Sequence, residues 1–244
     1  MKWKVLSSLI LFSQVVVVLA AEPSWDQYNQ LLKKYISPAE HHGTKLNWVK
    51  YSQLKKDPDF SLVIKQLENF SPDNLTTKEE KLAFYINAYN ILALKTIVDN
   101  WPVKSIKDVG SLFESVWKKD AGQIGGKTVT LNEVEHEILR PLGDPRIHMA
   151  IVCASVSCPD LRTEAYAANT LNEQLDDQTN RFLSNPAKGL KIDGNKVRIS
   201  RIFNWFKEDF QPGGVEVFIR QYKELPSDAN IKANMPYDWT VNGE

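Results

Sequence analysis

The sequence has little cysteine and no excess of either charge. Only 2 of its 244 residues are cysteine, and a chain of this length does not need a disulfide to fold, so bonded and free sulfurs both remain open. Lys and Arg total 30, as do Asp and Glu. Without a net field there is nothing to attract a nucleic acid or an anionic lipid surface. We therefore predict no nucleic-acid partner.

Long apolar runs are also absent after the N-terminus. Lys2 and Lys4 precede an apolar stretch over residues 6–19, and small residues stand before Ala21, which is typical of a cleavable signal peptide. The stretch is too short for a comfortable membrane span. We expect a signal peptide over residues 1–20 and a periplasmic or secreted protein with no transmembrane segment after its removal.

Internal repeats, low-complexity tracts and linkers are missing as well, which favours one domain over residues 21–244. The strongest element is a helix over about 77–100. Thr76 or Thr77 can begin it with a capping box, and it is apolar on nearly every face. The pattern predicts a helix-rich α+β fold in which this helix is central and buried beside a small β-sheet.

The remaining elements follow from periodicity and turn signals. We expect helices near residues 25–35, 61–70, 132–140, 170–185, 202–210 and 214–222, strands over 44–51, 127–131, 147–152 and 237–241, and a β-hairpin over 190–199. Aromatic residues crowd the segment 202–210, and we assign them to the core.

Candidate chemistry gathers around residues 144–161. The apolar run 147–152 reads as a buried strand, and the small polar loop after it carries Cys153, Ser157 and Cys158. A strand that ends in such a loop would fix it while leaving its polar groups reachable.

The helix over 132–140 supplies acid–base groups. Its apolar stripe leaves His136 and Arg140 one turn apart on another side, with Glu135 adjacent. A general-base role for this helix is therefore open.

The chain resembles the DUF547 family, a domain of unknown function in exported bacterial proteins. The matching stretches are LAFYINAYN from Leu82, PVKSI from Pro102, LNEVEHEILRP from Leu131, DPRIHMAIVCASVSCP from Asp144 and IFNWFKEDF from Ile202. Val152 stands where Asn is frequent and Tyr85 where Trp is usual. The resemblance implies functional positions at Asn87, Asn90, Glu135, His136, Arg140, Asp144, Arg146, His148, Cys153, Ser157 and Cys158, but no established activity.

One hypothesis is a thiol-dependent hydrolase or acyl transferase acting on peptide or amide substrates. Cys153 would be the nucleophile, His136 or His148 the base and Glu135 the orienting group, with Cys158 nearby. The substrate contacts would come from Asn87, Asn90, Arg140, Arg146 and Ser157. We predict no metal and no cofactor for this site.

Three alternatives remain open. Cys153 and Cys158 can form a structural or redox-active disulfide. Together with His136 and His148 they also have the atom types of a zinc site. In the third alternative the chain is a binding module for a peptide, glycan or small anion, whose arginines suit carboxylates. In this alternative Asn87, Asn90, Arg140 and Arg146 line the pocket and the sulfurs are only structural. For the two asparagines themselves we prefer the interpretation that they tie neighbouring loop backbone in place rather than contact a ligand, because a buried amide needs partners.

Overall fold

The computed structural model describes residues 22–111 and 114–244. The predicted signal peptide lies outside these ranges, so it and the expected export stay predictions. Within the described part of the chain, no helix is both long and apolar enough to cross a bilayer.

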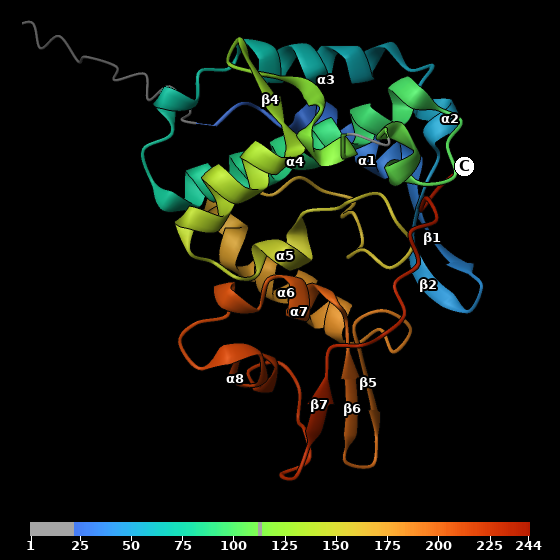
Figure 1. The fold of residues 1–244 in the computed structure, drawn as a ribbon. Helices are drawn as coiled ribbons and strands as arrows, with labels where there is room; N and C mark the ends of the chain where they lie inside the picture. Colours follow the sequence, from blue (N-terminus) through green and yellow to red (C-terminus); the bar gives the residue numbers. More distant parts are fainter. Residues whose placement is uncertain (1–21, 112–113) are drawn as a thin grey trace, which may run out of the picture.

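A long buried helix, α4 (Lys78–Asn100), runs through the larger half of the molecule (Figure 1). The predicted capping box forms between Thr77, whose hydroxyl accepts the Glu80 N–H, and Glu80, whose carboxylate accepts the Thr77 N–H. Buried residues occur on nearly every face of α4, because other elements cover it on all sides. The prediction of a buried central helix is confirmed.

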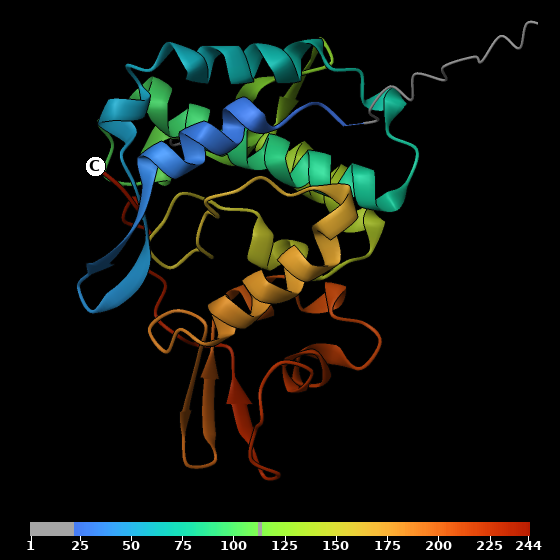
Figure 2. The ribbon, with the colours of Figure 1, turned by 180° about the vertical axis from the view of Figure 1, so that it is seen from behind.

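Three helices near the N-terminus cover one side of α4. They are α1 (Asp26–Tyr35), α2 (Tyr51–Leu54) and α3 (Pro58–Asn69). In Figures 1 and 2 they occupy the same half of the molecule as α4. Their apolar residues join those of α4 in the larger of two hydrophobic clusters.

The helix-rich α+β class is confirmed, but the strands do not form one central sheet. β1 (Ile36–His41) pairs with β2 (Thr44–Val49), β3 (Asp120–Ile124) with β4 (Lys127–Thr130), and β5 (Leu190–Asp193) with β6 (Lys196–Ile199), which also pairs in parallel with β7 (Asn230–Lys232). The described strands therefore form three small separate sheets at the periphery (Figure 1).

Residues from the second half of the chain form the smaller of the two hydrophobic clusters. It contains α6 (Leu171–Leu183), α7 (Ile202–Trp205) and α8 (Gly214–Arg220), together with the sheet β5-β6-β7 (Figure 2). Short 3-10 helices connect the larger elements: η1 (Pro72–Asn74), η2 (Ile106–Val109), η3 (Val116–Lys118), η5 (Arg140–Leu142), η6 (Ala168–Thr170) and η7 (Lys207–Asp209).

The prediction of a strand over residues 147–152 is wrong. Residues Ile147–Ala150 form the short helix α5, and an irregular loop follows. The segment is buried as expected, but Asn90 binds its backbone: the Asn90 amide donates to the Ala150 carbonyl at 3.0 Å and accepts the Val152 N–H at 2.9 Å. An apolar run of this length fits a buried helix as well as a strand, and here no neighbouring strand was available.

Two further segments differ from expectation. Residues Glu133–Leu139 form a π-helix, η4, within the predicted helix over 132–140. The predicted strand over 237–241 makes only an isolated bridge between Ser155 and Val241. Single-turn π segments frequently occur at functional sites, because the extra residue displaces side chains from the regular helical faces.

Candidate functional site: an aromatic pocket with a disulfide in its wall

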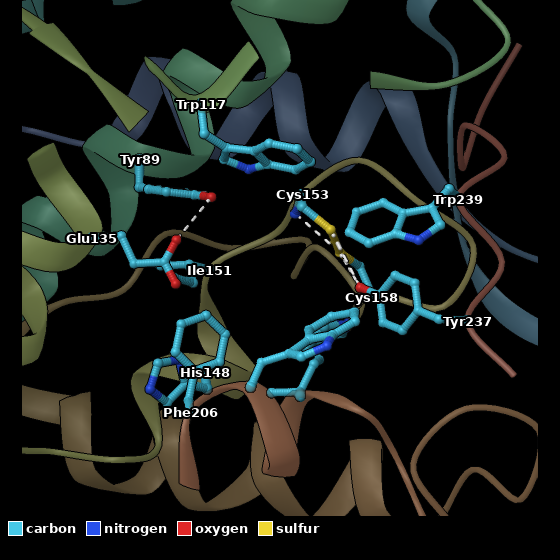
Figure 3. Close-up of a pocket in the computed structure, with 13 residues that line it drawn as sticks. Tyr89, Trp117, Glu135, His148, Ile151, Cys153, Cys158, Phe206, Tyr237 and Trp239 are labelled. Carbon is cyan, nitrogen blue, oxygen red and sulfur yellow. Dashed lines mark hydrogen bonds between the residues drawn. A yellow bond between two sulfur atoms is a disulfide. The ribbon is translucent and has the colours of Figure 1, made fainter. Parts of the chain in front are cut away.

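A cavity of about 100 Å³ lies where η4, α5, the Cys153 loop, α7 and the C-terminal segment meet (Figure 3). Six of its thirteen lining residues are Trp, Tyr or Phe, and the others are apolar or carry sulfur, except Glu135 and His148. Its lining consists of Tyr89, Trp117, Glu135, His148, Ile151, Cys153, Cys158, Pro159, Ile202, Trp205, Phe206, Tyr237 and Trp239.

Aromatic rings from distant parts of the sequence pack together on one side of the cavity. The ring centroids of Tyr237 and Trp239 are 4.5 Å apart, those of Trp205 and Tyr237 4.8 Å, and those of Trp205 and Trp239 5.7 Å. Trp117 meets Trp239 edge-on at 5.7 Å. Such separations are typical of favourable ring pairs, so the wall is held in shape by its own contacts.

A cation already lies on one of these rings. The Lys107 ammonium is 3.6 Å from the centroid of the Trp239 ring. Electron-rich indole faces attract positive charge, most strongly when water is excluded. The aromatic cluster therefore holds a positively charged group of its own chain.

Glu135 is the carboxyl group of the pocket. It is only 6% exposed, and its Oε2 accepts a hydrogen bond from the Tyr89 hydroxyl at 3.4 Å (Figure 3). Burial raises the pKa of Glu135 to about 7, and this effect exceeds the lowering by Tyr89 and by the charge of Arg140. The carboxyl group can therefore change its charge near neutral pH.

His148 lies at the same end of the cavity and is buried. Its Nε2 is 2.7 Å from the Asp209 carboxylate, and its ring stacks on Phe206 with centroids 4.1 Å apart. Burial lowers the pKa of His148 to about 4, despite the opposing effect of Asp209. The ring is thus neutral, and we assign the proton to Nε2 because that nitrogen faces a carboxylate. Nδ1 is buried without a hydrogen-bond partner.

Asp209 links His148 to Arg140. Arg140 donates two hydrogen bonds to Asp209, from Nε at 2.6 Å and from Nη2 at 2.8 Å. Its Nη1 also contacts Nδ1 of His136 at 2.7 Å, so that nitrogen accepts. Burial, then the charge of Arg140, lowers the pKa of His136. His136 is exposed on the outer side of η4 and does not line the cavity.

The two sulfurs are joined. Cys153 and Cys158 form a disulfide with an S–S distance of 2.07 Å and Cα atoms 6.2 Å apart. This is the disulfide alternative drawn from the sequence. Neither sulfur is a thiol in this state, so the hydrolase or transferase hypothesis applies only to the reduced protein and stays a prediction. The four candidate zinc ligands do not come together, because the two sulfurs are bonded to each other and His136 is hydrogen-bonded to Arg140.

The predicted substrate contacts lie elsewhere. Asn87, Asn90, Arg140, Arg146 and Ser157 do not line the cavity, and each is hydrogen-bonded within the chain. Asn87 binds the Tyr166 backbone through both amide atoms, as Asn90 binds the loop after α5. The preferred interpretation, in which the two asparagines hold backbone, is confirmed.

Arg146 serves the fold in a similar way. It donates to the Asp144 carboxylate at 2.6 and 3.0 Å and to Asp176 at 2.9 Å. Ser157 accepts the Asp238 N–H at 2.8 Å and so fixes the C-terminal segment beside the disulfide loop. These polar residues build the frame of the pocket rather than its surface.

Sequence reasoning missed the aromatic wall and Asp209. Trp205 and Phe206 stand in the aromatic-rich segment that was assigned to the core, although Trp205 is 43% exposed. Tyr237 and Trp239 were assigned to a strand. The signal that could have found them is the second group of aromatic residues, Tyr237 and Trp239, close to the C-terminus.

Comparison with known proteins identifies a family but no activity. Residues 72–183 match the family model described as "Protein of unknown function, DUF547". The matched range contains the central helix, Glu135, His148 and both cysteines, whereas Trp205, Phe206, Asp209, Tyr237 and Trp239 lie beyond it. No curated protein and no solved structure matches the chain.

Proposed function

We propose, from the pocket itself, that this protein is a binding module for a small organic cation. The DUF547 family model that matches residues 72–183 names no function. The ligand group would be an alkylated ammonium, either free or at the end of a peptide side chain. This narrows the peptide, glycan or small-anion ligands expected from the sequence. The observation that carries the proposal is one carboxyl group, Glu135, enclosed with a cluster of indole and phenol rings.

The aromatic wall favours a cation over a neutral apolar group. Ring faces of Trp and Tyr attract alkylated ammonium groups, and each contact contributes about 0.5–2 kcal/mol, depending on how much water is excluded. Trp205, Tyr237 and Trp239 lie within 4.5–5.7 Å of one another, close enough for one ligand group to touch more than one ring. The lysine already held on Trp239 shows the same preference within this chain.

The charges around the pocket also favour a cation over an anion. No arginine or lysine is among the lining residues, the Lys107 ammonium lies on the Trp239 ring, and the guanidinium of Arg140 is paired with Asp209. Burial raises the pKa of Glu135 and so favours its protonated form. A bound cation would instead stabilise the ionised form. Ligand binding and release of that proton are therefore coupled.

The size of the cavity limits what enters it. About 100 Å³ is well below the 300–1,000 Å³ usual for a site that encloses a whole drug-sized ligand. A headgroup or the end of a side chain fits, and the remainder of the ligand would lie outside.

The experiment compares tetramethylammonium or choline with 3,3-dimethylbutanol, the neutral analogue of choline, by isothermal titration calorimetry at pH 8. We expect the cation to bind about tenfold more tightly than the alcohol, because a cation–ring attraction of about 1.4 kcal/mol corresponds to a tenfold difference in affinity. At pH 6 the preference should fall by about tenfold, because a carboxyl group with a pKa near 7 is then mostly protonated.

Variants locate the binding. Glu135→Gln should abolish the pH dependence, and Trp205→Leu should weaken choline binding severalfold. Trp48→Leu is the matched control, since Trp48 stacks on His41 in the β1-β2 hairpin, outside the pocket. Equal affinity for the alcohol and the cation at pH 8, or no binding of either at millimolar concentration, would refute the proposal.

A further inference from the structure

We propose that the Cys153–Cys158 disulfide is an electron acceptor that undergoes thiol–disulfide exchange with thiols entering the pocket. This activity goes beyond cation binding and does not depend on it. The inference rests on where the two sulfurs lie, on their unequal exposure and on the donors that face them. A disulfide that only held the loop closed would require none of these features.

The disulfide lies in the wall of the cavity, at the edge of the larger hydrophobic cluster, to which Cys158 belongs and against which Cys153 packs. Both sulfur-bearing residues line the pocket (Figure 3). Cys153 is partly exposed, whereas Cys158 is only 2% exposed. Exchange begins with attack of a thiolate on one sulfur, and access decides which sulfur is attacked. A thiolate that enters the pocket would therefore attack Cys153.

Hydrogen-bond donors surround the sulfur that would leave. The Cys153 backbone N–H donates to Cys158 Sγ at 3.1 Å, and the Tyr237 hydroxyl lies 3.3 Å from the same sulfur. Cys153 Sγ is 3.4 Å from the Tyr237 hydroxyl and 3.4 Å from the Ser155 hydroxyl, so the backbone N–H is the donor that distinguishes Cys158. A disulfide sulfur carries no hydrogen, so Tyr237 must donate. Both donors would stabilise the negative charge that forms on Cys158 as the bond breaks, and a more stable leaving thiolate departs faster.

The backbone of the loop holds this arrangement in advance. Ala154, directly after Cys153, has a φ of 55°, in the left-handed region that a residue with a Cβ seldom adopts. Asn90 anchors the segment before Cys153, and Asn242 donates its N–H to the Ala154 carbonyl at 3.2 Å. The donors thus face Cys158 before any reaction takes place.

The chemistry balances with a dithiol as the reductant. Its thiolate attacks Cys153 Sγ and forms a mixed disulfide, while the Cys153–Cys158 bond breaks and its electron pair leaves on Cys158. The second thiolate of the dithiol then attacks the dithiol sulfur of the mixed disulfide and releases Cys153 as thiolate. The two protons given up by the dithiol end on Cys153 and Cys158, so the dithiol is oxidised by two electrons and the protein disulfide is reduced.

The first test measures the rate at which dithiothreitol opens the disulfide, with acid quench, alkylation and intact-mass analysis. The native protein should react at least tenfold faster than the same chain unfolded in urea under otherwise equal conditions. Tyr237→Phe, which keeps the ring and removes the donor, should react about tenfold more slowly than wild type. Tyr51→Phe is the matched control: it also removes a buried phenol that binds the C-terminal segment, through Asn242 at 2.8 Å, but it contacts neither sulfur.

The second test assigns the attacked sulfur. With glutathione disulfide, Cys158→Ala should form the mixed disulfide on Cys153 at least tenfold faster than Cys153→Ala forms it on Cys158. Equal rates in the two variants, or a native disulfide that opens no faster than the unfolded one, would overturn the proposal. Choline affinity measured on the same samples reports separately on the binding proposal.

Discussion

Asn90 offers a sharp test of how the pocket is held, because one side chain pairs two buried backbone groups. Asn90 is 2% exposed, donates to the Ala150 carbonyl at 3.0 Å and accepts the Val152 N–H at 2.9 Å. Asn90→Ala removes both partners at once. Each buried backbone group left unpaired costs roughly 1–3 kcal/mol, so the free energy of unfolding should fall by roughly 2–6 kcal/mol.

Urea denaturation followed by circular dichroism measures this loss. With an m-value of about 2–3 kcal/mol/M, the unfolding midpoint should fall by about 0.7–3 M. Asn100→Ala is the matched control, because Asn100 ends the same helix and is exposed, and its side chain donates only to the Thr96 carbonyl at 2.9 Å. Its effect should stay within about 0.5 kcal/mol. Equal midpoints for the two variants would refute the reasoning.

Two predictions concern titration. Glu135, with its pKa raised from 4.5 to about 7, stabilises the folded state fully below pH 4.5 and loses this contribution as pH rises through 7. Glu135→Gln should therefore reduce the loss of stability between pH 4.5 and 8 by roughly 3 kcal/mol in urea titrations, and parallel pH curves for wild type and variant would contradict this. His148, with its pKa lowered to about 4, contributes stability above pH 6.5 that is lost as pH falls through 4. Nitrogen-15 NMR should show a neutral Nε2–H ring at pH 5.5, and an imidazolium signal there would contradict the assignment.

Local patterns in the sequence predicted elements whose stability depends on neighbouring residues. The capping box at Thr77 and the continuous apolar content of residues 82–98 specified a buried helix, because both features act within the helix itself. The hairpin over 190–199 followed in the same way from its turn. The demand that Asn87 and Asn90 find partners also came from the sequence, since a buried amide without partners is costly anywhere.

Tertiary contacts decided the segment that carries the cysteines. Residues 147–152 have the apolar content of a buried strand, but a strand needs a neighbouring strand. Here residues 147–150 form α5 instead, and the Asn90 amide binds the backbone of Ala150 and Val152. The sequence also suggested that His136 and the cysteines could share one site. On the π-helix His136 is exposed and Glu135 is buried, and which of the two faces the interior depends on what packs against each face.

The sequence by itself determined the helix-rich α+β class, the central helix and the match of residues 72–183 to the DUF547 family model, because each depends on local periodicity or on contiguous motifs. The pocket belongs to the tertiary structure alone. Its wall joins Trp117, Glu135, the Cys153 loop, Trp205 and Trp239, which are far apart along the chain, and no pattern of residue spacing encodes contacts between such distant segments. Their meeting is set by the packing of the two hydrophobic clusters against each other, which only the folded chain reveals.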